Sequence, residues 1–361
     1  DASSMLQVAD VVAATLAVSA VRAAYGAAAL KDEVHGLPGA PAVPWRMFSG
    51  YVDVSNPGEP TGSRQMFYWF VESQKEPSAD PVMLWTNGGP GCSGLGGFLT
   101  EQGPFRPGVD GKYLTLNEFS WAKVANMVFI EQPVGVGFSK TSVKIDYGDS
   151  QAAADNYRFT VGFFKRYPQY AAQAFYISSE SYGGHYMPTL ARQLKEGGEV
   201  PQFRGIFLGN PLTYMMYTNY GMYGTAWGHQ LLPAPLWKRY GDASCATTSP
   251  PSDACTNITD VMDQILSDLD PYALDFDKCA SPATSVGRHE RWIMRRAISR
   301  ASAALRHSSI STALLSDLAS EPAYQPCIDD YMAAYLNRAD VQAVIHVKSG
   351  AKWIMCSNEV F

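Results

Sequence analysis

Ser181 lies in a segment whose pattern is typical of a nucleophilic serine. Residues 175–178 form a short apolar run, and Ser-Glu-Ser-Tyr-Gly-Gly follows over residues 179–184. A strand, a sharp turn and a helix start in this order form a nucleophile elbow, which exposes the serine hydroxyl at the carboxyl end of a sheet. Glycine usually stands two places before the serine, where this chain has Ser179, which is small enough to preserve the turn. A serine in an ordinary tight turn is the alternative that this motif alone leaves open.

A second segment could supply the hydrogen-bond donors that such a serine needs. Residues 84–93 read Leu-Trp-Thr-Asn-Gly-Gly-Pro-Gly-Cys-Ser. Three glycines and a proline expose backbone N–H groups, which can stabilise the oxyanion that forms during acyl transfer. A phosphate-binding loop is the other interpretation, but the segment lacks the Lys-Ser/Thr ending that binds phosphate and magnesium.

The elements around these motifs alternate between strands and helices. Short apolar runs predict buried strands of a mixed or parallel sheet, and the stretches between them predict helices. The strands are expected at residues 66–71, 82–86, 127–130, 175–178 and 205–208, and the helices at residues 150–165 and 186–196. This alternation favours an α/β fold.

The pattern changes after Pro211. Strand signals are absent from residues 214–326, which predicts a helical insertion, and residues 331–347 predict a helix that returns to the core. Residues 288–307 contain six arginines, which indicates either a solvated helix face or a loop that is removed by proteolysis. The expected division is an N-terminal extension (1–32), an α/β core (33–213), a helical cap (214–326) and a return to the core (327–361).

The first thirty residues are rich in alanine and valine. Asp10 and Arg22 interrupt this apolar stretch, which makes a membrane span less favourable. The segment is either the remnant of a signal peptide or a helix that packs on a partner, and the sequence does not separate the two. No other stretch predicts a membrane span.

Charge and cysteine content narrow the class of protein. The net charge of −6 argues against a nucleic-acid-binding protein, which usually carries a basic face. The six cysteines include no closely spaced pair of the kind that binds zinc, so disulfides in an oxidising compartment are favoured over six buried free thiols. Asn257 begins the triplet Asn-Ile-Thr, an N-glycosylation signal that fits secretion. The sequence predicts no metal site and no cofactor.

Long motifs along the chain resemble those of the serine carboxypeptidase family. The matching segments are residues 37–39, 48–51, 85–93, 101–104, 117–126, 129–139, 180–184, 209–210, 219–231 and 327–347. The resemblance extends over residues 33–361. It implies an α/β-hydrolase fold, with a mixed, mostly parallel sheet and a helical cap inserted after Asn210.

The resemblance also implies a reaction and the residues that perform it. Ser181 would attack the last peptide carbonyl to form an acyl-enzyme, and the N–H groups of Gly89 and Tyr182 would form the oxyanion hole. The carboxylate of the peptide substrate would be bound by the residues that match the family's carboxylate-binding set, namely Asn87, Gly88, Glu101 and Glu180. Two glutamates can bind a carboxylate if they share protons, so an acidic pH optimum is expected. The disulfide pairs implied by the resemblance are Cys92–Cys356, Cys245–Cys255 and Cys279–Cys327.

The family's catalytic Asp and His have no match in this chain. Both follow the position of Cys356 in the family, so the resemblance implies an incomplete or processed chain whose missing segment, such as a separate C-terminal light chain, would supply the Asp and His. His185, four residues after Ser181, is more typical of a packing histidine than of a base. Two further interpretations stay open: a catalytically inactive structural or interaction subunit, and an acyltransferase that uses an acyl-sugar donor.

The same resemblance suggests where the protein is found. It implies a place in the secretory pathway, vacuolar, lysosomal or extracellular, and allows a homodimer. Tyr214, Tyr217, Tyr220 and Tyr223 indicate either an apolar pocket near the cap entrance or one packed face of a helix. The preferred side chain of the substrate is left open.

Overall fold

The computed structural model describes residues 25–145, 147–269, 274, 279, 327–347 and 350–357. The predictions for residues 1–24 and for the basic stretch 288–307 therefore lie outside the described residues. The chain divides into two compact units, and each is described by itself. Unit 1 comprises residues 1–107, 111–212 and 332–361, and unit 2 comprises residues 108–110 and 213–331.

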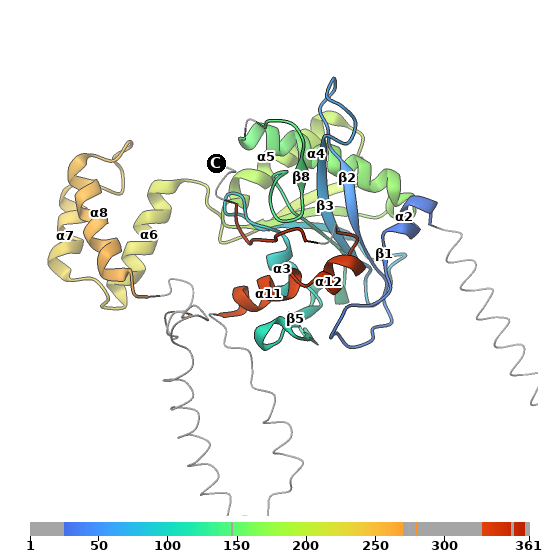
Figure 1. Ribbon diagram of the computed structural model, residues 1–361. Helices are drawn as coiled ribbons and strands as arrows, with labels where there is room; N and C mark the ends of the chain where they lie inside the picture. Colours follow the sequence, from blue (N-terminus) through green and yellow to red (C-terminus); the bar gives the residue numbers. More distant parts are fainter. Residues whose placement is uncertain are drawn as a thin grey trace, which may run out of the picture. The chain divides into compact units, whose positions relative to one another are not determined.

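Unit 1 is built on an eight-stranded mixed sheet (Figure 1). Seven strands follow the order β1-β2-β3-β7-β4-β9-β10, and β8 pairs with β3. β7, β4, β9 and β10 run parallel, whereas β1, β2 and β3 join them by antiparallel pairing. The strands are β1 (Glu33–Val34), β2 (Met47–Asp53), β3 (Arg64–Val71), β4 (Val82–Thr86), β7 (Asn126–Ile130), β8 (Lys140–Thr141), β9 (Phe175–Glu180) and β10 (Phe203–Gly209). The predicted α/β-hydrolase fold with a mixed sheet is thus confirmed.

Helices cover both faces of this sheet (Figure 1). On one face, α4 (Asp149–Arg166) and α5 (Gly183–Gly197) bury side chains such as Phe159 and Leu190 against β2, β3 and β9. On the other face, α3 (Leu95–Thr100), α11 (Ile328–Leu336) and α12 (Ala339–Val344) enclose a second core. Because both faces are covered, β3 and β7 consist almost entirely of buried residues and appear in the sequence as continuous apolar runs.

The single helix expected over residues 331–347 is wrong, because the structure has two helices there. Arg338 adopts an extended conformation between α11 and α12. The side chain of Asn337 explains the break, since its amide donates to the carbonyls of Ala333 and Trp353 and its oxygen accepts from the Trp353 amide. An asparagine that bonds the backbone in this way competes with helix continuation.

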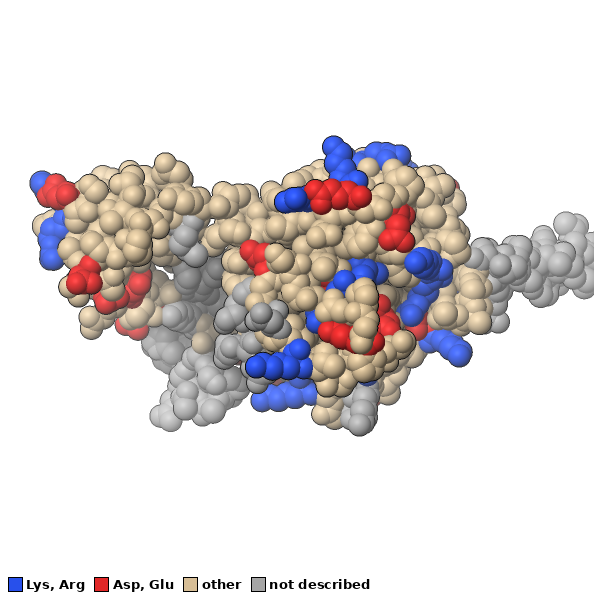
Figure 2. All heavy atoms as spheres, turned by 90° about the horizontal axis from the view of Figure 1, so that it is seen from above, with Lys and Arg blue, Asp and Glu red and all other residues tan. Residues whose placement is uncertain are grey.

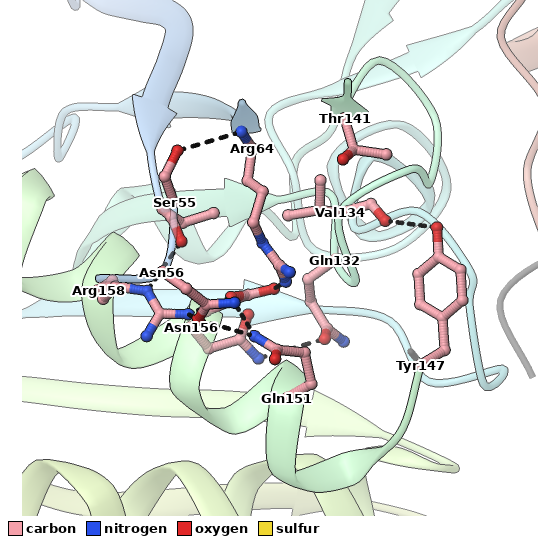
Figure 3. A network of polar contacts seen from close by, with 12 residues as sticks. Ser55, Asn56, Arg64, Gln132, Val134, Thr141, Tyr147, Gln151, Asn156 and Arg158 are labelled. Atoms are coloured by element: carbon pink, nitrogen blue, oxygen red, sulfur yellow. Dashed lines mark hydrogen bonds and ion pairs between the residues drawn. The ribbon is translucent and has the colours of Figure 1, made fainter. Parts of the chain in front are cut away.

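A buried polar network attaches the first turns of α4 to β3 (Figure 3). Arg64 and Asp155, exposed by only 2% and 1%, form an ion pair, and Asp155 also accepts a hydrogen bond of 2.5 Å from Arg158. Arg158 bonds Asn56 as well, at 2.7 Å. A buried charge is tolerated only when it is paired in this way, so the network fixes the orientation of α4.

Smaller elements complete unit 1. A two-stranded sheet pairs β5 (Phe105–Pro107) with β6 (Leu114–Leu116), and α2 (Ala27–Lys31) precedes the main sheet. The short 3-10 helices of unit 1 are η2 (Trp121–Lys123) and η3 (Pro168–Tyr170), whereas two of the three residues of η1 (Val109–Gly111) belong to unit 2. Basic and acidic groups of the described residues intermingle on the face shown in Figure 2, so this face has no extended surface of one charge.

The described part of unit 2 is helical. It contains α6 (Met215–Gly228), α7 (Ala234–Asp242) and α8 (Asp253–Leu266). Tyr223, Tyr240 and Met262 form its small core, which the Cys245–Cys255 disulfide supports. Asn257, the predicted glycosylation residue, is exposed on α8. Within the described parts of both units, no helix has the length and apolar character needed to cross a bilayer.

Candidate active site

Ser181 forms the sharp turn between β9 and α5. Its φ of 52° lies in the left-handed region, which is uncommon for a residue other than glycine and is typical of a nucleophile elbow. The Ser181 amide donates to the carbonyl of Gly209 at 3.1 Å, and its carbonyl accepts from Leu212 at 2.7 Å. These bonds to the end of β10 and to Leu212 just after it hold the turn in its unfavourable conformation.

The unusual Ser179 is accommodated by a glycine opposite it. A Cβ atom added to Gly183 would lie 2.0 Å from the Ser179 hydroxyl oxygen, so no other residue fits at position 183 without a shift. Ser179 is fully buried. Because Gly183 has no side chain, the strand and the helix can pack closely there. The turn therefore keeps its shape although Ser179 stands where glycine is usual.

The glycine loop, residues 87–93, packs directly against the Ser181 turn. A Cβ atom on Gly88 would lie 2.5 Å from the Tyr182 nitrogen and 3.1 Å from Cβ of Ser181. Gly89 has a φ of 109°, and its amide donates no hydrogen bond to any described residue. Tyr182 occupies the N-cap position of α5, where backbone N–H groups and the helix dipole favour negative charge. The two N–H groups expected to form an oxyanion hole thus belong to segments that touch.

The anchor segment, residues 353–357, holds the outer side of the glycine loop. The Ser93 amide donates to Met355 at 2.8 Å, and the Ser357 amide donates to Gly91 at 2.9 Å. The Cys92–Cys356 disulfide joins the same two stretches. The structure forms this disulfide, Cys245–Cys255 and Cys279–Cys327, which are the pairs that the resemblance implies.

Asn87, Glu101 and Glu180 converge into one group, called here the carboxylate cluster. The Asn87 amide nitrogen donates to Glu101 at 2.7 Å and to Glu180 at 2.9 Å. Its oxygen accepts from the Trp85 indole at 3.0 Å and from the Gly97 amide at 2.9 Å. These two bonds fix which way the Asn87 amide points, so its NH2 group faces the carboxyls.

Residues that the sequence analysis did not assign hold Glu101 in place. Arg106 and Asn117 both donate to the Glu101 carbonyl, the latter at 3.0 Å. A cavity of about 500 Å³ borders the cluster, and its lining includes Glu101, Glu180, Trp85 and Trp121. In the sequence, Trp85 lies two residues before the glycine loop, and Asn117 and Trp121 belong to the matching segment 117–126, but neither pattern showed that these residues surround Glu101.

None of the histidines described in unit 1 makes a hydrogen bond to Ser181. His185 lies 3.7 Å from a carboxylate oxygen of Asp149 and stacks on the Tyr182 ring. His346 contacts the Ser49 carbonyl through Nδ1 at 2.9 Å. In the described part of the chain, no group of three or more His, Cys, Asp or Glu residues could hold a metal ion. Ser181, the backbone of Gly89 and Tyr182 and a carboxyl-lined pocket are therefore brought together, and none of the histidines described in unit 1 contacts the serine by a hydrogen bond.

Comparison with known proteins gives concordant results. The profile of the family described as "Serine carboxypeptidase" matches residues 38–361. Serine carboxypeptidase-like 34 of Arabidopsis thaliana is 36% identical over 349 residues, which cover 92% of this chain and 69% of that protein. Serine carboxypeptidase 24 of the same plant is 33% identical over 342 residues, covering 91% and 69%. Among solved structures, the prohormone-processing carboxypeptidase Kex1 of Saccharomyces cerevisiae shares the fold, with a TM-score of 0.65, 21% identity, and coverage of 92% and 72%.

Proposed function

The chain belongs to the serine carboxypeptidase family, and from that premise we propose that it removes C-terminal residues from peptides through an acyl-enzyme on Ser181. The observation that carries the proposal is the carboxylate cluster beside the Ser181 turn. Asn87 binds both Glu101 and Glu180, and Glu180 directly precedes the nucleophile. An endopeptidase, which cleaves inside a peptide, does not need a group that binds a terminal carboxylate directly beside its serine.

The reaction follows from the positions of these groups. The Ser181 oxygen attacks the last peptide carbonyl while its proton passes to a base, and the N–H groups of Gly89 and Tyr182 stabilise the oxyanion. The C–N bond then breaks, the amine takes a proton and the terminal residue leaves. Water attacks the acyl-Ser181 ester, which releases the shortened peptide and restores the hydroxyl.

The carboxylate cluster supports the proposed acidic optimum. An incoming carboxylate is attracted by the Asn87 NH2 group, whereas negative charge on the two glutamates that share this amide would repel it. Peptide binding should therefore weaken as pH rises, with a larger effect on KM than on kcat. Replacing the peptide carboxylate by an amide should remove this pH dependence.

The base and its orienting Asp come, in this proposal, from a partner segment such as a light chain. Two observations support a further polypeptide at this position. No described histidine of unit 1 bonds Ser181, and the edge strand β10 exposes Ile206 by 39% and Phe207 by 49%. β10 lies next to β9, the strand that carries the nucleophile turn. A partner strand paired with β10 would cover these side chains close to Ser181.

The test is fluorophosphonate labelling of the native protein, followed by assays of blocked dipeptides. Labelling that Ser181→Ala abolishes, with release of the C-terminal residue, supports a peptidase. Glu101→Gln should raise KM, while Glu118→Gln, an exposed glutamate nearby, should not. Labelling with transfer of an acyl group from a sugar ester instead of hydrolysis would identify an acyltransferase. Absence of labelling would refute the proposal and favour an inactive subunit.

The setting proposed for this activity is the secretory pathway, with a vacuolar, lysosomal or extracellular destination. Three disulfides support an oxidising compartment. N-glycosylation of Asn257 and a homodimer remain proposals, which mass measurement of the native protein before and after deglycosylation would test.

A further inference from the structure

A fully buried glutamate lies beneath the glycine loop. Glu131 directly follows β7, has no exposed surface and is paired with no Lys, Arg or His of the described residues. Instead its carboxyl oxygens accept three short hydrogen bonds. Ser93 Oγ and Trp353 Nε1 each donate to Oε1 at 2.6 Å, and the Phe138 amide donates to Oε2 at 2.6 Å. These donors come from three segments far apart in the sequence.

The space around the Glu131 carboxyl fits a carboxylate and leaves no room for a side chain at residue 137. A Cβ atom added to Gly137 would lie 1.9 Å from Glu131 Oε1, so residue 137 has to be glycine for the carboxyl to fit. All three donors point toward the carboxyl oxygens, which is the arrangement that an ionised carboxylate prefers. If the carboxyl is protonated, the only partner that can turn to accept its proton is the Ser93 hydroxyl, because the other two are N–H groups.

This carboxyl is connected to the nucleophile through a short chain of contacts. Ser93 is the last residue of the glycine loop, and Trp353 is the first residue of the anchor segment that holds the loop. The Cys92 amide donates to the Gly88 carbonyl at 3.2 Å, and Gly88 packs on the backbone of Ser181 and Tyr182. A change in the Glu131–Ser93 bond therefore acts on the loop that carries the Gly89 N–H group.

We propose that Glu131 is a positioning residue, and that its ionised form holds the glycine loop in the geometry that stabilises the oxyanion at Ser181. The inference rests on the proposed function. Burial raises the pKa of Glu131 to about 7, although its three hydrogen bonds act in the opposite direction. Tyr51 of β2 faces it, and burial followed by the charge of Glu131 raises the pKa of Tyr51, which therefore stays neutral. Loop geometry should accordingly change across neutral pH.

The test uses the rate of Ser181 labelling by a fluorophosphonate, which carries no C-terminal carboxylate and so does not report on the carboxylate cluster. The full native protein and Glu131→Gln are compared from pH 5 to 8.5. Because the base titrates alike in both proteins, its effect cancels when the labelling rate of the variant is divided by that of the native protein. This ratio therefore reports only the effect of residue 131. It should already be below one at pH 5, because the Gln NH2 group faces an N–H donor at every pH. It should fall about a further tenfold by pH 8, less than the hundredfold or greater cost of deleting an oxyanion donor. A ratio independent of pH overturns the proposal.

Two matched controls separate positioning from general damage. Trp353→Phe removes a donor that favours the ionised form, so the midpoint of the labelling profile should move to higher pH. Trp69→Phe makes the same change at a buried indole whose N–H group has no partner among the described residues, and the midpoint should stay. Glu72→Gln replaces another buried glutamate, which binds Tyr170, and should leave the ratio flat.

If the native protein does not react with fluorophosphonate, the proposed function fails, and hydrogen exchange then decides on Glu131 separately. Above pH 7, Glu131→Gln should speed exchange of the backbone amides in the glycine loop relative to those of β3 and β4. Equal exchange in the two proteins would show that Glu131 does not position the loop, whether or not Ser181 is active.

Discussion

The stability of the protein should depend on pH through Glu131. Its pKa is about 7 in the folded chain against an ordinary value of 4.5, so between these values the folded state retains a proton that the unfolded state has lost. Stability from this group is therefore fully present below about pH 4.5 and is lost as pH rises toward 7. At about 1.4 kcal/mol for each pKa unit, the loss amounts to roughly 3 kcal/mol.

Glu131→Gln isolates this contribution because glutamine does not titrate. Its NH2 group has to face either an indole or an amide N–H, which costs about 1–3 kcal/mol at every pH. The difference in unfolding free energy between parent and variant, from urea titrations at intervals between pH 4.5 and 8, should shrink by roughly 3 kcal/mol as pH rises. A difference that stays constant over this range would refute the reasoning.

Three further substitutions test the packing around the site. Gly88→Ala places a Cβ atom 2.5 Å from the backbone nitrogen of Tyr182, next to Ser181. The rate of Ser181 labelling should therefore fall at least about hundredfold while the circular dichroism spectrum is retained. A normal labelling rate would contradict the close approach of the two segments. Asp155→Asn should cost about 3–5 kcal/mol in urea unfolding because it leaves the buried Arg64 with only the more distant Glu59, at 3.8 Å, as an ionic partner. Arg64→Met should cost less because a second arginine still binds Asp155, and the opposite order would count against this account of the network. Replacing both cysteines of Cys92–Cys356 by serine should cost about 5 kcal/mol, against about 3 for Cys245–Cys255, because the first disulfide closes 264 residues and the second 10; equal losses would argue against loop closure as the cause.

Much of the site was predictable from sequence because its signals are local. The Ser181 turn needs only a strand, a small residue and a helix start within ten positions, and the glycine loop needs only glycines that allow close approach. The strands β3, β4, β7 and β9 were recognisable because burial on both faces makes them continuous apolar runs. β2 was missed as a strand, since Ser49 and Gly50 interrupt its apolar pattern although both are buried.

Only the tertiary structure decided which distant groups meet. Glu101 and Glu180 lie 14 and 93 residues from Asn87, and no periodicity relates them; the sheet and α3 bring them to one amide. Trp353 and Glu131 are 222 residues apart, and their contact exists because the anchor segment folds back along the glycine loop. By itself the sequence therefore determined the candidate nucleophile turn and the loop beside it, which short-range backbone preferences specify. The shared amide, the buried carboxyl and the break at Asn337 depend on burial and long-range hydrogen bonds, which arise only when the whole core is packed.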